Sequence, residues 1–341
     1  MSSLMFTETA EAPQAAARLI AANDAACRDL AERLRASPPR FAVTCARGSS
    51  DSVATYAKYL LEIQLGLVVA SVGPSVSSIY DAKPRMDGAL FIAVSQSGRS
   101  PDLIKLTDTA RAAGALTIAF VNDSASPLSQ KSEVVLPLHA GPERSTAATK
   151  SYIASLVAFL QLLAHWSGDQ EISHAVARLP DDLEAARRRD WTAALPLLAK
   201  TSNLYVTGRG PGYAAALEAA LKLKETCGIH AEAVSAAELI HGPLALVGPD
   251  FPVVLFAQRD AALASLSELA GSLTERAVPV IAAGPGSWGR ALALPDATDL
   301  HPFAQPICQV LSFYTVAEAL SRARGLDPDR PPHLQKVTET R

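Results

Sequence analysis

The sequence ALFIAVSQSGRS, residues 89–100, runs from six consecutive apolar residues into Ser95-Gln96-Ser97-Gly98. A short apolar run bounded by turn residues is typical of a strand that is buried on both faces. The same order occurs earlier in the chain, where Phe41–Cys45 (FAVTC) precedes Gly48-Ser49-Ser50. A helical pattern follows each turn. These segments therefore predict strand–turn–helix units and a mostly parallel sheet, which is an α/β fold.

The rest of the chain continues this alternation. Further strands are expected at residues 67–72, 116–121, 134–138, 204–207, 252–256 and 278–283. Helices are expected over the first forty residues, which end at Pro38-Pro39, and at 53–65, 102–113, 213–226 and 301–324. Residues 147–199 are predicted to be helical, with breaks around Gly168 and Pro180.

The second half of the chain mirrors the first. Arg47-Gly48 corresponds to Arg209-Gly210, and Gly66 corresponds to Gly228, both at an offset of 162 residues. A constant spacing of this kind indicates two similar α/β domains. We expect an N-terminal helical segment at 1–40, a first domain at 41–199, a second domain at 200–326 and a C-terminal tail at 327–341. Prolines make the tail extended at its start.

Composition excludes several classes of protein. Of the 341 residues 49% are apolar and 19% are charged, and the net charge of −3 argues against both disorder and nucleic-acid binding. The four cysteines lack a C-x-x-C spacing, so neither a zinc cluster nor a disulfide framework is expected. The most apolar stretch, 153–166, is too short to span a membrane, and no signal peptide is evident. We expect a soluble, cytoplasmic protein.

The turn at 95–100 carries hydroxyl and amide groups at the start of a helix. Ligands of open parallel sheets bind outside the carboxyl ends of the strands, and a helix N-terminus favours an anion. The turn therefore indicates a phosphate site without a lysine. Serine and glycine are also the usual residues of turns and N-caps, so a purely structural turn is the alternative. The second turn, Gly48-Ser49-Ser50, favours the phosphate hypothesis.

Polar residues recur on the helix expected at 213–226. Glu218, Lys222 and Glu225 have the spacing i, i+4, i+7, which places them on one face. The ordinary interpretation is a solvated stripe in which a Glu–Lys pair contributes about 0.3 kcal/mol. The titratable residues that follow weaken that interpretation: His230, Glu232, Glu238 and His241. His241 precedes Gly-Pro and indicates a loop histidine suited to proton transfer.

Two further features of the sequence are less specific. The spacing from Glu238 to His241 resembles a metal motif, but it lacks a second histidine at helical spacing, so no metal is expected. Lys336 in the tail is by default a solvated lysine.

Together these segments resemble the sugar isomerase (SIS) family, and more closely the isomerase half of glutamine–fructose-6-phosphate aminotransferase and its stand-alone relatives. The most specific resemblance lies in residues 217–246. The matching segments are Gly48–Ser50, Ser95–Gly98, Thr146–Lys150, Leu217–Glu225, Ile229–Ala233, Glu238–Leu246 and Leu334–Lys336.

The resemblance implies two tandem SIS domains, each a five-stranded parallel sheet flanked by helices, and a homodimer whose sites are shared between subunits. It implies that Glu225 moves a proton between C1 and C2 of an open-chain phosphosugar and that His241 opens the ring from the neighbouring subunit. It implies that Lys336 forms a Schiff base with the ketose. The implied phosphate-binding residues are Ser50, Ser95, Gln96, Ser97 and Ser100. The implied supporting residues are Gly48, Ser49, Thr146, Ala148, Glu218, Lys222 and Gln335. No cofactor, metal, membrane or nucleic acid is implied.

The expected activity takes into account several departures from the aminotransferase pattern. Ala148 replaces a serine, Arg99 replaces a glutamate and Ile240 replaces a lysine, whereas the ending, 336–340, resembles stand-alone deaminases and deglycases. We expect the chain to lack a glutaminase domain, because Met1-Ser2-Ser3 offers no N-terminal cysteine. The expected reaction is conversion of glucosamine 6-phosphate to fructose 6-phosphate and ammonia. The alternatives are a deglycase of 6-phosphorylated fructosamines, a deaminase or isomerase for another amino-sugar phosphate, and a non-catalytic phosphosugar-binding regulator.

Overall fold

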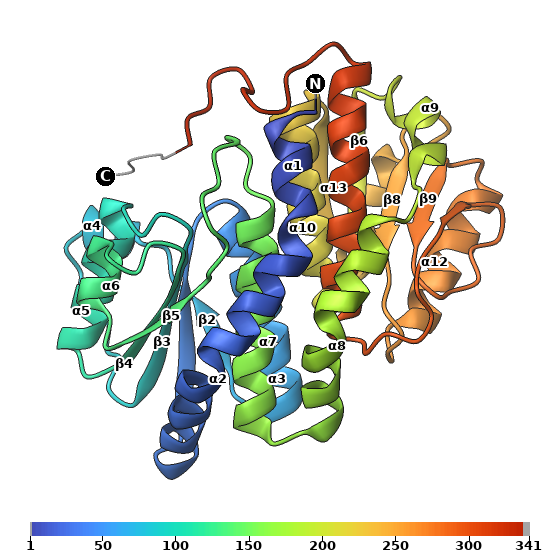
Figure 1. Cartoon of the computed structure of the whole chain (residues 1–341). Helices are drawn as coiled ribbons and strands as arrows, with labels where there is room; N and C mark the ends of the chain where they lie inside the picture. Colours follow the sequence, from blue (N-terminus) through green and yellow to red (C-terminus); the bar gives the residue numbers. More distant parts are fainter. Residues whose placement is uncertain (1, 337–341) are drawn as a thin grey trace. The chain divides into compact units, whose positions relative to one another are not determined.

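A computed structural model describes residues 2–336 of the chain, which form two compact units (Figure 1). Among the described residues, the first-sheet unit comprises 14–143, 150–177 and 335–336. The second-sheet unit comprises the residues up to 13, together with 144–149 and 178–334. Residues 337–341, and with them most of the ending that resembles deaminases and deglycases, lie outside the described residues.

The first-sheet unit contains a five-stranded parallel sheet in the order β2-β1-β3-β4-β5. Its strands are β1 (Phe41–Cys45), β2 (Val69–Ser71), β3 (Ala89–Ser95), β4 (Leu116–Val121) and β5 (Val134–Pro137). Its helices are α2 (Ala12–Ala36, which begins in the other unit), α3 (Ser49–Leu65), α4 (Ser75–Ser78), α5 (Pro101–Ala112), α6 (Pro127–Lys131) and α7 (Lys150–Ser167). The predicted bounds of β1 and β4 are confirmed.

The second-sheet unit repeats this order of strands, because its sheet runs β7-β6-β8-β9-β10 and is also parallel. The strands are β6 (Asn203–Gly208), β7 (His230–Ser235), β8 (Val253–Phe256), β9 (Val280–Ala283) and β10 (Leu292–Leu294). The helices are α1 (Leu4–Ala10), α9 (Leu195–Leu198), α10 (Pro211–Cys227), α11 (Ala236–Leu239), α12 (Leu263–Glu275) and α13 (Gln305–Ala323). Helix α8 (Gln170–Arg187) passes from one unit into the other.

Apolar side chains on both faces of each sheet explain the continuous apolar runs of the sequence. On one face of the first sheet, Phe91 packs in a core cluster with Leu106 of α5. On the other face, Phe120 of β4 meets Phe159 of α7 with ring centroids 5.8 Å apart. The central strands are therefore covered on both sides, which is the arrangement that parallel sheets require.

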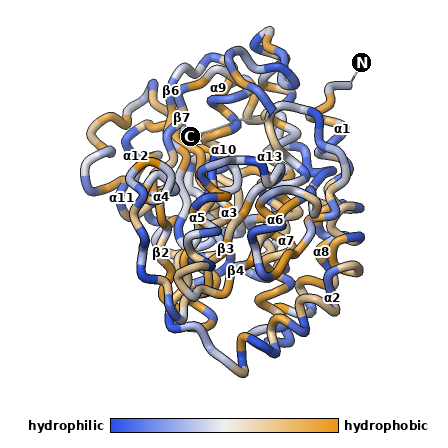
Figure 2. Tube along the Cα trace, turned by 90° about the vertical axis from the view of Figure 1, so that its left-hand side faces the viewer, coloured by the Kyte–Doolittle hydropathy of each residue, from blue (hydrophilic) through white to orange (hydrophobic). Residues whose placement is uncertain are grey.

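Helix α2 shows a different pattern, because only one of its faces is buried. Most of its buried residues recur three or four positions apart, and they include Ala12, Ala15, Ala16, Leu19, Asn23, Cys27, Leu30, Ala31 and Leu34. Figure 2 shows the resulting alternation of hydrophilic and hydrophobic residues along this helix. Pro38-Pro39 follows its end, as predicted.

The internal repeat extends to backbone angles. Helices α3 and α10 each have 17 residues and begin after a glycine of the same unusual conformation. Gly48 has φ 54° and ψ −133°, and Gly210 has φ 59° and ψ −139°. Residues with a Cβ rarely adopt this region, so both strand-to-helix turns require glycine. Gly66 and Gly228, the second matched pair, both cap their helices in the left-handed conformation.

Several elements depart from the sequence prediction. Strand β7 occupies residues in which we expected no strand. Only Ala231 and Val234 of this edge strand are buried, so the sequence shows no apolar run there. Strand β10 and helix α12 were not predicted either. The helix break expected around Pro180 is wrong, because Pro180 lies inside α8. Leu179, Leu183 and Ala186 are fully buried on either side of it, and this burial stabilises a continuous helix.

No helix among residues 2–336 combines the length and the apolar character needed to cross a membrane.

The four cysteines are free and buried, and this makes a prediction for thiol chemistry. Burial raises the pKa of Cys27 and Cys45 to about 12 and that of Cys227 to about 11, so the reactive thiolate is scarce near neutral pH. Burial likewise raises the pKa of Cys308. We expect no thiol to react with Ellman's reagent at pH 8 in the native protein and all four to react in guanidinium chloride. One stoichiometric reaction in the native state would contradict this expectation.

Candidate active site

The serine-rich turn at 95–100 lies at the carboxyl end of β3, at the start of α5. The backbone N–H of Gly98 donates to Ser95 Oγ at 3.1 Å, and the N–H of Arg99 lies 3.4 Å from Ser97 Oγ. Ser100 is the N-cap of α5, but its side chain makes no capping hydrogen bond. The first turn of α5 therefore presents N–H groups that its own cap does not satisfy, which suits an anion.

Close packing holds the shape of this turn. Gly98 has φ +63°, and a Cβ at this position would lie 2.1 Å from Ser126 Oγ, so only glycine fits. Ser126 is fully buried, and its hydroxyl lies 2.9 Å from that of Ser129. The turn is therefore anchored to the loop that follows β4.

An ion pair joins the 95–100 turn to the Gly48 turn. Strands β1 and β3 are neighbours, so the turns that follow them lie at the same edge of the sheet. The Arg47 guanidinium donates to Asp102 Oδ2 through Nε at 3.2 Å and through Nη2 at 2.8 Å. Asp102 is 1% exposed, and it also accepts the N–H of Leu103. This fixed carboxylate holds together the two turns that carry Ser50, in the first turn of α3, and Ser97.

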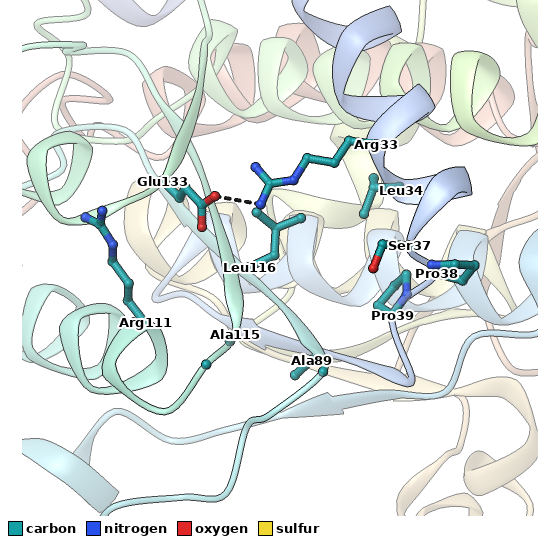
Figure 3. A pocket seen from close by; sticks show the side chains of 12 residues that line it. Arg33, Leu34, Ser37, Pro38, Pro39, Ala89, Arg111, Ala115, Leu116 and Glu133 are labelled. Carbon is teal, nitrogen blue, oxygen red and sulfur yellow. Dashed lines mark hydrogen bonds and ion pairs between the residues drawn. The ribbon is translucent and has the colours of Figure 1, made fainter.

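Two pockets of the first-sheet unit lie at opposite edges of its sheet. One, of about 450 Å³, is lined by Gly88, Ala89, Ala115 and Leu116 and is therefore at the amino ends of β3 and β4 (Figure 3). Its Arg33 and Glu133 already pair with each other at 2.6 Å. The other, of about 740 Å³, lies beyond the carboxyl ends of β4 and β5 and is lined by residues that include Asn122–Ser124 and His139. Ligands of parallel sheets bind at the carboxyl edge, so the first pocket is not the expected site.

The polar face of α10 forms a charged cluster in the second-sheet unit. Glu218 and Lys222 have fully buried side chains, with Nζ 3.4 Å from Glu218 Oε1. Lys222 also pairs with Glu225, whose side chain is 22% exposed. Tyr314 of α13 donates its hydroxyl to Glu218 Oε1 at 2.7 Å. A solvated stripe is therefore wrong for Glu218 and Lys222, whereas Glu225 is open to solvent.

The charges in this cluster hold Lys222 in its protonated form. Burial alone lowers the pKa of a lysine, but the carboxylates of Glu218 and Glu225 together outweigh it and raise the pKa of Lys222. The ammonium therefore stays charged throughout the neutral range and fixes both carboxylates. Glu225 is the member of the cluster that a molecule in solvent can reach.

Replacing the buried lysine tests how strongly the cluster depends on it. We expect Lys222→Met to lower the free energy of unfolding by about 3–5 kcal/mol, because it leaves Glu218 buried without its cation. Lys224→Met is the matched control, since Lys224 is exposed on the same helix, and it should change stability by less than about 0.5 kcal/mol. Urea unfolding measures both values. Equal effects of the two substitutions would show that the buried ammonium is not needed.

The other predicted residues lie in loops. His241 and Gly242 follow α11 and are exposed, and the His241 N–H donates to the carbonyl of Glu238. Thr146 and Ala148 are half-buried, and the N–H of Thr146 donates to the carbonyl of Asp329. In the first-sheet unit, Gln335 is exposed, whereas Lys336 contacts Glu143. The structure therefore brings together Glu218, Lys222 and Glu225 in one unit, and the serine turns in the other.

The second sheet has a turn that corresponds to 95–100, but side chains of the chain itself occupy it. Gln258, at the carboxyl end of β8, donates to the carbonyl of Arg209 at 2.9 Å and to Asp260 Oδ2 at 2.6 Å. A Cβ on Gly210 would lie 3.7 Å from the same Asp260 oxygen. A carboxylate of the protein therefore lies beside the start of α10.

Sequence reasoning missed three groups that the structure adds to these sites. Tyr314 lies in an apolar helix and could not be distinguished from a core aromatic. Asp102 resembled an ordinary acidic residue in the first turn of a helix. Glu143 lies in the loop between β5 and α7 and shows no local pattern. The one signal in the sequence was the arginine that precedes the glycine turn in both repeats, Arg47 and Arg209.

Comparison with known proteins identifies the family. The sequence profile of the SIS domain matches residues 39–165 and 197–283. The chain is 32% identical over 318 residues to the glutamine–fructose-6-phosphate aminotransferase (isomerizing) of Thermotoga maritima, a match that covers 86% of this chain and 50% of that protein. The chain thus spans about half the length of the curated relatives it matches.

Solved structures agree with this result. A Silicibacter pomeroyi DSS-3 protein assigned as a phosphosugar isomerase superimposes with a TM-score of 0.92 at 44% identity, covering 96% of this chain and 100% of that one. The C-terminal domain of glucosamine-fructose-6-phosphate aminotransferase from Francisella tularensis superimposes with a TM-score of 0.82 at 24% identity, over 97% and 99% of the two chains, and shows the shared fold. The chain belongs to the SIS domain family, and the predicted pair of five-stranded parallel sheets is confirmed.

Proposed function

We propose that this protein is a phosphosugar isomerase that acts as a deaminase, converting glucosamine 6-phosphate and water to fructose 6-phosphate and ammonia. The observation that carries the proposal is the α10 cluster, in which a buried, protonated Lys222 fixes the solvent-accessible carboxylate of Glu225. Aldose–ketose isomerisation needs one such carboxylate to carry a proton between adjacent carbons. The relationship to aminotransferases of the isomerizing kind supports a phosphosugar substrate.

The serine turns are proposed to bind the 6-phosphate of the substrate. Ser50, Ser95, Gln96, Ser97 and Ser100 lie around the N-termini of α3 and α5, where the positive ends of the helix dipoles favour an anion. Because these groups are neutral, they bind the phosphate through hydrogen bonds. The Arg47–Asp102 pair supports this role by fixing the two turns relative to each other.

Each proposed step has a group to perform it. His241 donates and accepts the protons of ring opening. Glu225 removes the proton from C2 of the open-chain amino aldehyde and returns it to C1, while the C1 oxygen gains the proton that the C2 amine loses. The result is a hydroxymethyl group at C1 and an imine at C2. Water hydrolyses the imine directly, or Lys336 displaces ammonia to form its own Schiff base, which water then hydrolyses. The net change is addition of one water and release of one ammonia.

The cysteines among the described residues are not suited to taking ammonia from glutamine. Taking ammonia from a glutamine amide by covalent catalysis needs an activated nucleophile such as a cysteine thiolate. All four thiols of this chain are buried, and burial raises the pKa of each. None of them is suited to that task.

A panel of substrates tests the proposed reaction. Ammonia release is measured with glucosamine 6-phosphate, galactosamine 6-phosphate, a 6-phosphorylated fructosamine and unphosphorylated glucosamine. Turnover of glucosamine 6-phosphate alone supports the proposal. Release of the amine from the fructosamine alone would identify the protein as a deglycase instead of a deaminase. Turnover of galactosamine 6-phosphate alone would identify galactosamine 6-phosphate, instead of glucosamine 6-phosphate, as the substrate. Binding of the phosphosugars without turnover would identify a regulator.

Replacing Glu225 with glutamine keeps the size of the side chain and removes the base. We expect Glu225→Gln to lower kcat about 100- to 10,000-fold while phosphosugar binding persists, because the phosphate turns are unchanged. Steady-state ammonia release and calorimetric binding of fructose 6-phosphate measure the two effects. Glu232→Gln is the matched control, since Glu232 is an exposed carboxylate on β7 of the same unit. A Glu225→Gln variant that keeps most of its rate would exclude this mechanism.

We further propose a homodimer in which His241 serves the site of the neighbouring subunit. His241 is exposed, and so are two large apolar residues of the same segment, Ile240 at 55% and Leu246 at 65%. Contact with a second copy of the chain would cover these apolar side chains.

Mixing two inactive variants tests the shared site. A chain with His241→Ala is combined with a chain with Glu225→Gln, and subunits are exchanged. Every mixed dimer contains one site with both lesions and one site with neither. Because random pairing makes about half of the dimers mixed, roughly a quarter of the wild-type activity should return. A mixture that remains inactive, although mixed dimers are detected by mass spectrometry, would refute the shared site.

A further inference from the structure

Lys336 of the tail is held by a carboxylate that the sequence did not single out. Its Nζ lies 2.9 Å from Glu143 Oε2, although the two residues are 193 positions apart. The Glu143 side chain is fully buried, whereas that of Lys336 is 24% exposed. The carboxylate is therefore the fixed partner, and the ammonium is the one that solvent and small molecules can reach.

The start of α7 fixes the Glu143 carboxylate. Its Oε1 accepts the N–H of Ser151 at 3.1 Å, and its Oε2 accepts the Ser151 hydroxyl at 2.6 Å. Helix α7 has 18 residues, and the positive end of its dipole favours a negative charge at this position. These hydrogen bonds satisfy the buried carboxylate and hold it in one orientation.

We propose that Glu143 is the counter-ion and proton acceptor of Lys336 in formation of the Schiff base. The inference rests on the proposed function, in which Lys336 reacts with the C2 carbonyl of fructose 6-phosphate or with the C2 imine that precedes it. Glu143 positions the amine and exchanges protons with it.

The step balances with these groups alone. Glu143 takes one proton from the Lys336 ammonium, and the freed amine attacks C2 of the ketose to give a carbinolamine. The carbinolamine oxygen takes up the proton held by Glu143 and a second proton from Lys336 Nζ. It then leaves as water. The product is a protonated imine, which carries the same single positive charge as the ammonium. Glu143 therefore faces a cation before and after the reaction, and no charge is left unpaired.

Borohydride trapping tests this role in the full-length protein. Fructose 6-phosphate and sodium borohydride are added, and the reduced adduct on the Lys336 peptide is quantified by mass spectrometry over time. We expect Glu143→Gln to slow trapping about 100-fold or more, while the affinity for fructose 6-phosphate stays unchanged. Glu143→Asp, which keeps the charge, should restore part of the rate. Glu133→Gln is the matched control, since that carboxylate pairs with Arg33 at the other edge of the sheet, and it should trap like the wild type.

The outcomes separate this inference from the proposed function. Trapping by Glu143→Gln at the wild-type rate, or equally slow trapping by Glu143→Asp, would overturn the role of the carboxylate and leave the ammonia-release reaction intact. No adduct in the wild type, although fructose 6-phosphate binds, would overturn the roles of both Lys336 and Glu143. If Glu143→Gln fails to fold, Ser151→Ala tests the same role. It removes one hydrogen-bond donor to the Glu143 carboxylate and should slow trapping. An unchanged trapping rate would contradict the proposal.

Discussion

The glycine turn between the first strand and the first helix of each repeat is the constraint on which the architecture depends. At Gly48 and at Gly210 the backbone adopts angles that side chains rarely allow, and there the chain turns from a buried strand into a 17-residue helix. The N-terminus of each helix is thereby placed at the carboxyl edge of its sheet. In the first repeat this edge gathers hydroxyl groups at the N-termini of two helices. In the second repeat the helix carries the charged cluster along its length.

The charged cluster shows why burial and chemistry are linked in this fold. Lys222 is enclosed within the protein, so its charge is tolerated only because carboxylates surround it. The same carboxylates are held in place by the lysine and, for Glu218, by the hydroxyl of Tyr314. A rigid, ionised arrangement next to solvent is the setting in which a carboxylate such as Glu225 can be oriented toward a substrate. Because a buried lysine is tolerated only with its carboxylates in place, the groups of the cluster are held in a fixed geometry.

Much of the fold could be predicted from the sequence because its signals are local. The bounds of β1 and β4 followed from short apolar runs next to turn residues, and the repeat followed from glycines at a constant offset. Strand β7 was missed because it lies at an edge, where His230 and Glu232 are exposed and no apolar run forms. The spacing of Glu218, Lys222 and Glu225 predicted their shared face. Their burial could not be predicted, because Tyr314 approaches from 96 residues away. The Glu143–Lys336 contact is equally non-local, so no window of sequence contains it.

The two repeats, finally, differ in where they hold negative charge. In the first, the Asp102 carboxylate in the first turn of α5 is paired with the Arg47 guanidinium, whereas in the second Asp260, beside the start of α10, accepts from the neutral amide of Gln258. A duplicated fold would by symmetry offer two anion sites per chain, and we expect the carboxylate of Asp260 to disfavour an anion at the second. We therefore expect each chain to bind one phosphorylated ligand at these turns rather than two.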